Sequence, residues 1–204
     1  MANHSWLTGL ILLSCFAATC CGTVIMFSSL NRALIVTATP QAGQVLQAGE
    51  DTITVSWSYN TSFPAGTDSN YRTVKIMLCY APISQRDRGW RKTVDQLNKD
   101  KTCQHEIVSR PYTRSNNNFT YTVKKDVPSA TYFIRAYALD SHGTEAAYGQ
   151  TTNAQKTTNL FDVQAISGRH VSLDVASACF SAFSVISLFG FFYMEKRKAK
   201  SQSK

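Results

Sequence analysis

Short runs in which hydrophobic and polar residues alternate recur through the middle of the chain. From 52 to 59 an apolar side chain occupies every second position and Ser or Thr the others, which is typical of a half-buried strand. Similar runs, separated by clusters of turn-forming residues, predict further strands over 73–80 and 119–123, and a content of aromatic and β-branched residues predicts another over 131–139. Because no long amphipathic helix lies between these short strands, the pattern predicts an all-β, immunoglobulin- or fibronectin-III-like sandwich with Trp57 in its core.

An uncharged stretch near the end of the chain has the length of a membrane span. Residues 175–194 contain no Lys, Arg, Asp or Glu, and as a helix they would be about 30 Å long, which matches a hydrocarbon core. Five basic residues and no acidic one follow within 196–204. The sequence therefore predicts a transmembrane helix over 173–194 and a basic cytoplasmic tail over 195–204. A buried core helix is the less favoured alternative, since such helices are rarely free of charge over this length.

Two small residues of this predicted helix, Ala178 and Ala182, lie four positions apart and share one face. A face of small residues lets a second helix approach closely, so the pair is a candidate site of helix packing. Small residues are also simply tolerated in such helices, and the sequence favours neither interpretation.

A second apolar segment opens the chain. Small residues follow its most hydrophobic part, as in a cleavable secretory signal peptide, which we predict over 1–26. No Lys or Arg precedes the apolar part and the stretch is long, so a retained first span is the alternative. Either form leaves 27–172 as an extracellular domain.

The cysteines and the sequons also indicate the secretory pathway. Outside the two apolar segments only Cys79 and Cys103 remain, and in an exported domain they permit one intramolecular disulfide. Two free thiols are the less favoured alternative. The triplets that begin at Asn60 and Asn118 are N-glycosylation acceptors in turn-like, polar surroundings. The sequence therefore predicts a disulfide-bonded glycoprotein.

Charge and motifs argue against nucleic-acid binding and catalysis. The net charge is +8, but half of this excess lies in the basic tail. The chain contains no G-x-S-x-G, H-E-x-x-H, P-loop or G-x-G-x-x-G motif, and its four histidines are scattered. We therefore predict a non-catalytic protein that has no metal, cofactor or small-molecule substrate of its own and no nucleic-acid partner.

Basic residues gather over 86–101, between the strand that ends at Tyr80 and Cys103, and Trp90 lies among them. Trp among arginines on a connection is the composition of a protein-interaction hot spot. A disulfide would present this segment as a closed loop. The alternatives are a solvated charged loop with Trp90 packed back onto the domain, or a weak anion-binding patch. Composition alone favours the solvated loop.

The same stretch carries a family resemblance. The chain resembles the plant high-affinity nitrate transporter-activating proteins, the small partner subunits of two-component nitrate uptake systems, from about residue 34 to residue 198. The matching segments are LCYAP at 78–82, DRGWRK at 87–92, KDKTC at 99–103, TYFIRAYA at 131–138 and AYGQ at 147–150.

The resemblance implies a function that composition does not. It implies an accessory subunit that binds, stabilises and activates a polytopic high-affinity nitrate/proton symporter at the plasma membrane, so that nitrate is taken up. It also reverses the preference for a merely solvated loop and implies carrier contacts at Arg88, Trp90, Arg91 and Asp100. A single-pass cell-surface adhesion or receptor-type protein has the same layout and is the alternative.

Overall fold

The computed structural model describes residues 24–115, 117–168 and 171–202, and it divides into two compact units after Gln164. The first unit, which we call the head, is built of nine described strands. These are β1 (Leu34–Ala38), β2 (Val45–Gln47), β3 (Thr52–Tyr59), β4 (Thr73–Tyr80), β5 (Cys103–Pro111), β6 (Asn117–Thr122), β7 (Ala130–Leu139), β8 (Glu145–Gln150) and β9 (Phe161–Gln164). Short 3-10 turns join some of them, and α2 (Val171–Gln202) lies in the second unit.

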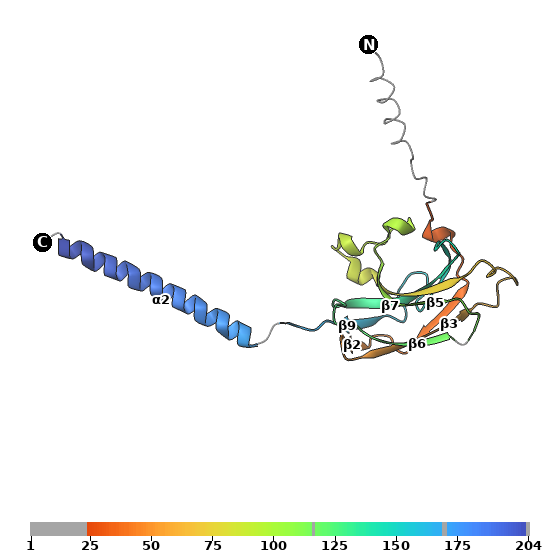
Figure 1. Cartoon of the computed structure of the whole chain (residues 1–204), viewed down its shortest axis with the longest axis horizontal. Helices are drawn as coiled ribbons and strands as arrows, with labels where there is room; N and C mark the ends of the chain where they lie inside the picture. Colours follow the sequence, from red (N-terminus) through yellow and green to blue (C-terminus); the bar gives the residue numbers. More distant parts are fainter. Residues whose placement is uncertain (1–23, 116, 169–170, 203–204) are drawn as a thin grey trace, which may run out of the picture. The chain divides into compact units, whose positions relative to one another are not determined.

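The strands form two sheets that face each other (Figure 1). One sheet has three strands in the order β1-β3-β6, with both pairs antiparallel. In the other, β7 pairs with β4 on one edge and with β8 and β9 on the other, while β5 extends the sheet beyond β4 and β2 runs parallel to β9. This arrangement confirms the predicted all-β sandwich.

The core lies between the sheets, and the alternation in the sequence places its residues. In β3 the positions of Ile53, Val55 and Trp57 are buried while the intervening Ser and Thr side chains are partly exposed. Trp57 is 3% exposed, which confirms it as a core residue. Apolar side chains of β4, β7 and β9 meet these residues from the opposite sheet, so the alternation in the sequence fixes which face of each strand is buried.

Gly149 of β8 allows the backbones of two strands to approach each other. A Cβ atom at this position would lie 2.3 Å from the carbonyl oxygen of Leu34 in β1 and 2.7 Å from its carbonyl carbon. Backbone atoms cannot swing aside as a side-chain tip can. We therefore expect Gly149→Ala to lower the free energy of unfolding by about 1–3 kcal/mol, as for other overpacked positions. Thermal unfolding checks this, and Gly89→Ala is the control because a Cβ there meets nothing within 4 Å.

The second unit contains one long helix. Within α2 the segment Val171–Lys198 is long and apolar enough to cross a membrane, and no residue of its most hydrophobic window is buried. The predicted span 173–194 falls inside this segment. Ala178 and Ala182 both lie on α2 with exposed side chains.

Candidate functional site

The structure closes the basic segment into a loop. Cys79 and Cys103 form a disulfide, which confirms the pairing permitted by the sequence, and the two residues also oppose each other at the end of the β4–β5 ladder. We call the intervening residues 81–102 the disulfide loop. It contains three 3-10 helices of a single turn each, Pro82–Gln85, Gly89–Arg91 and Leu97–Lys99. The loop has no helix longer than these. The loop is therefore held by its contacts with the head and not by regular secondary structure.

A second, smaller hydrophobic cluster anchors the loop. It lies on the outer face of the larger sheet, around Met77, Cys79, Phe133 and Tyr137, and Leu97 of the loop packs against it. The side chains of these strand residues would face water if the sheet were bare. The loop thus covers apolar surface on the side of the sheet that faces away from the core.

A buried arginine lies at the centre of this cluster. Arg135 of β7 is 1% exposed, and it donates hydrogen bonds to Gln150 at 3.1–3.2 Å and to the Tyr137 hydroxyl at 2.9 Å. Its guanidinium carbon lies 4.2 Å from the centre of the Phe27 ring. The sequence alone predicts no role for Arg135. The available signal was a charged residue inside a strand that is otherwise apolar.

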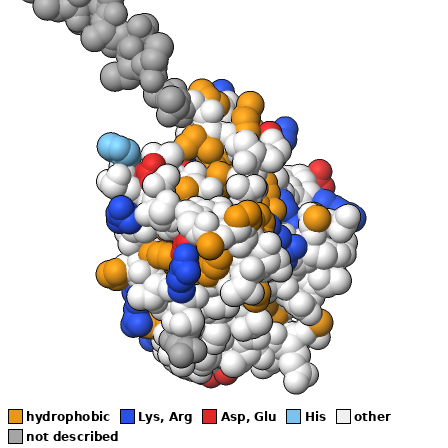
Figure 2. Space-filling model, turned by 90° about the vertical axis from the view of Figure 1, so that its right-hand side faces the viewer, with side chains coloured by type: hydrophobic (Ala, Val, Ile, Leu, Met, Phe, Trp, Pro, Cys, Tyr) orange, Lys and Arg blue, Asp and Glu red, His pale blue; other side chains and the backbone are white. Residues whose placement is uncertain are grey.

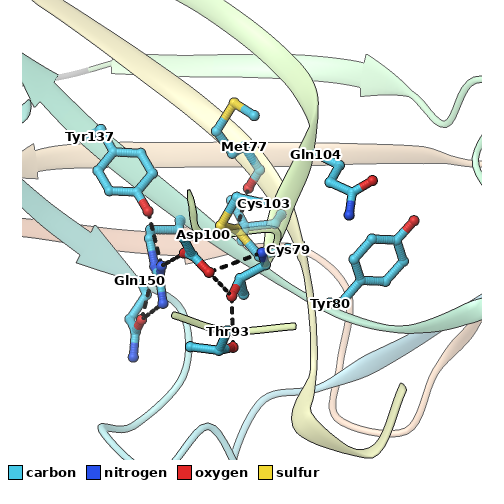
Figure 3. Close-up of a disulfide and its surroundings, with 12 residues drawn as sticks. Met77, Cys79, Tyr80, Thr93, Asp100, Cys103, Gln104, Tyr137 and Gln150 are labelled. Atoms are coloured by element: carbon cyan, nitrogen blue, oxygen red, sulfur yellow. Dashed lines mark hydrogen bonds and ion pairs between the residues drawn. A yellow bond between two sulfur atoms is a disulfide. The ribbon is translucent and has the colours of Figure 1, made fainter. Parts of the chain in front are cut away.

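Asp100 connects the loop to this arginine. One carboxylate oxygen of Asp100 accepts hydrogen bonds from the backbone and hydroxyl of Thr102 and from the backbone of Val94, at 2.6–3.2 Å. The other oxygen lies 3.9 Å from Arg135, and the Asp100 side chain is only 6% exposed. Figure 3 shows Asp100 pointing inward, among the sheet residues and beside the disulfide. Asp100 is therefore placed to hold the loop in position.

Arg91, another predicted contact residue, is also buried. It is 7% exposed, and its guanidinium lies over the Tyr80 ring at 4.3 Å from the ring centre. One of its nitrogens donates a long hydrogen bond of 3.4 Å to the Ser84 carbonyl, while its Nε–H has no partner among the described residues. The Tyr80 hydroxyl also lies 3.1 Å from Nε2 of His105, and burial lowers the pKa of that imidazole.

The other two predicted contact residues are on the surface. Trp90 is 63% exposed and Arg88 is also exposed, so both side chains are accessible on the loop. Figure 2 shows one face of the head, where apolar side chains lie among uncharged surface and charged groups of both signs. An exposed Trp beside an exposed Arg is accordingly a more specific feature than an exposed aliphatic residue.

Residues 25–28 hold the loop from its other side. The backbone N–H and hydroxyl of Ser28 each donate to the Asp95 carboxylate at 2.8 Å, and Leu97 N–H donates to the Ile25 carbonyl at 2.9 Å. Residues 25 and 26 thus pack with the head, although the sequence analysis assigned them to the signal peptide. Most of that predicted segment, residues 1–23, lies outside the described residues.

Both predicted glycosylation sites lie away from the disulfide loop. Asn60 directly follows β3 and is partly exposed, and Asn118 is exposed on β6, where it pairs with Ser56 in the ladder. These positions leave room for a glycan.

Comparisons with known proteins decide the family. Residues 27–168 match the family model NAR2, described as high-affinity nitrate transporter accessory, Ig-like domain. The chain belongs to this family. Its relatives include high-affinity nitrate transporter 3.1 of Arabidopsis thaliana, 52% identical over 89% of this chain and 88% of that protein, and high-affinity nitrate transporter-activating protein 2.1 of Oryza sativa subsp. japonica, 50% identical over 86% and 84%.

The family assignment confirms the resemblance found in the sequence and the immunoglobulin-like fold. For this member of the nitrate transporter accessory family it also agrees with the prediction of a non-catalytic role. A solved Niemann-Pick type C2 protein from the Japanese carpenter ant covers 71% of the chain at 11% identity, but its TM-score of 0.29 is too low to inform the fold. The contact residues Arg88, Trp90, Arg91 and Asp100 stay predictions.

Proposed function

We propose that this chain is the accessory subunit of a high-affinity nitrate transporter and activates that carrier at the plasma membrane. The observation that carries the proposal is the family match over 27–168, together with relatives named as nitrate transporter-activating proteins. An adhesion or receptor module shares the sandwich and the span, but it receives no support from the family.

The proposed topology places the head outside the cell and the C-terminus in the cytoplasm. A disulfide and two sequons in the head are typical of the exported side, and the basic residues after 195 are typical of the cytoplasmic side. The helix α2 would then cross the membrane beside the carrier, with Ala178 and Ala182 as the proposed packing face.

The disulfide loop is the proposed contact with the carrier, through its exposed residues. Trp90 and Arg88 are accessible, whereas Arg91 and Asp100 are buried and hold the loop that presents them. We propose that Trp90 and Arg88 contact the carrier directly and that Asp100 positions the loop, while Arg91, although mostly buried, also lines a surface groove.

The proposed function is tested by expressing a high-affinity nitrate carrier in cells with and without the full-length chain. We expect surface delivery of the carrier and nitrate-dependent current to rise when the chain is present. Equal delivery and current in both cells would contradict the proposed function.

The contact role of the exposed loop residues has its own variants. Trp90→Ala or Arg88→Glu should weaken co-purification with the carrier by about fivefold or more, because truncated hot-spot residues cost more than 1 kcal/mol. Lys125→Glu is the charge-matched control, since Lys125 is exposed and lies outside the loop. If the loop variants co-purify as well as the control, the loop is not the contact.

A further inference from the structure

An open groove lies beside the last residue of the head. It has a volume of about 320 Å³ and is lined from four segments that meet there: Val45 of β2, Ile83 and Arg88 of the disulfide loop, the start of β7, and the end of β9 at Gln164. Val45 and Ile83 are 52% and 58% exposed, so the groove presents apolar side chains to its surroundings. Neither residue was singled out by the sequence analysis.

The groove carries a net positive charge, because Arg88 and Arg91 line it together with a single carboxylate, that of Asp162. Arg91 lines the groove and is only 7% exposed. No carboxylate of the described residues lies within 4.0 Å of its guanidinium. Arg88 at the rim likewise has no ion pair within the described part of the chain. The one acidic lining residue, Asp162, accepts a hydrogen bond from the Thr131 hydroxyl at 2.6 Å. A buried guanidinium without a counter-ion is costly, so an incoming carboxylate would be favoured.

The predicted glycosylation site at Asn60 lies away from the groove. Ala48 N–H donates to the Gln164 carbonyl at 2.9 Å, and Asp51 N–H donates to the Gln47 carbonyl at 3.0 Å, so β3 begins near the end of β9. Asn60 follows the far end of that eight-residue strand, about 26 Å away at the usual rise per residue. A glycan at Asn60 would therefore leave the groove uncovered.

We infer that this groove is the docking site for a carboxylate-bearing, apolar-flanked segment of the carrier. The inference rests on the proposed function and adds which surface of the head is used and which chemistry it recognises. Phospholipid headgroups are disfavoured for two reasons. The outer leaflet lacks the negative surface potential of the cytoplasmic one, and the apolar residues line a depression, whereas side chains that enter a bilayer protrude from the surface.

The test compares two isoleucines that are similarly exposed but lie on different surfaces of the head. Ile83 is 58% exposed in the groove, and Ile35 is 49% exposed on β1. In cells that express the full-length chain with the carrier, Ile83→Glu should weaken co-purification of the carrier at least tenfold and reduce nitrate current. Ile35→Glu should change both by less than twofold. Cell-surface amounts of each variant show that the head folds and is exported.

A photo-crosslinking residue placed at position 83 identifies the occupant. We expect an adduct with the carrier from position 83 and none from position 35. Suppose that the wild-type chain activates the carrier. The groove assignment is then overturned if position 83 gives only a lipid adduct or no adduct. It is also overturned if the Ile83→Glu variant is as active as wild type. If the wild-type chain fails to activate the carrier, the proposed function itself fails.

Discussion

Asp100→Ala should destabilise the head more than any other single substitution in the disulfide loop. The substitution removes three hydrogen bonds to Thr102 and Val94 and leaves the buried Arg135 without its nearby carboxylate. Removing one partner of a buried charge pair typically costs 3–5 kcal/mol, which for a chain of this size lowers the melting temperature by about 6–20 °C. Thermal unfolding of the full-length chain in detergent measures it.

Two further variants isolate the cause. Asp95→Ala is the matched control: Asp95 is an exposed carboxylate on the same loop, paired with Ser28, and its loss should cost about 1 kcal/mol. Asp100→Asn keeps an oxygen acceptor for Thr102 but removes the charge beside Arg135, so its loss of stability should fall between the two alanine variants. If Asp100→Ala and Asp95→Ala are equally stable, Asp100 does not hold the loop.

This prediction separates two ways in which a loop residue affects carrier binding. A direct contact residue, when replaced, weakens binding and leaves the melting temperature unchanged, as we expect for Trp90 with its 63% exposure. A positioning residue lowers both together, as we expect for Asp100. The sequence places the two residues in one basic segment and cannot distinguish them, because burial depends on the sheet behind the loop.

The strands with alternating patterns, and β7 with its aromatic and β-branched residues, were predictable from the sequence, and the others were not. The predicted strands 52–59 and 73–80 coincide with β3 and β4, because each has one face in the core. Strand β5 was missed: as an edge strand it is mostly exposed, so polar residues occupy both faces. Strand β2 is only three residues long and shows no period. Pairing in the finished sheet, and not local pattern, makes these segments strands.

The site was predictable in part for a similar reason. The cysteine spacing and the basic composition located the loop, since both are properties of neighbouring residues. The groove combines β2, the loop, β7 and β9, which are far apart in the sequence, and Val45 and Ile83 have no local feature that marks them. Arg135 is likewise defined by partners such as Gln150 and Phe27, which only the fold brings together.

Replacing both Cys79 and Cys103 by Ala should lower the free energy of unfolding by about 3 kcal/mol. The two residues are separated by 24 positions, and a crosslink of that span removes about this much conformational entropy from the unfolded chain. The native loop should persist in the variant, because Cys79 and Cys103 also oppose each other in the β4–β5 ladder and Asp100 remains in place. We therefore expect the double variant to be less stable but still able to bind the carrier. Its melting temperature falls, while the amount of carrier that co-purifies below the variant's melting temperature stays within about twofold of wild type.

The control is a cysteine outside the head. Cys179 is free and lies on α2, so Cys179→Ala should leave the melting temperature of the head unchanged. A reducing agent should lower the melting temperature of wild type and of Cys179→Ala to that of the double variant, without changing the double variant itself. If carrier binding is instead lost at low temperature in the double variant, the disulfide and not the ladder shapes the loop. That outcome would mean that the β4–β5 pairing alone cannot maintain the loop conformation that binds the carrier. Reduction of the disulfide would then abolish carrier binding.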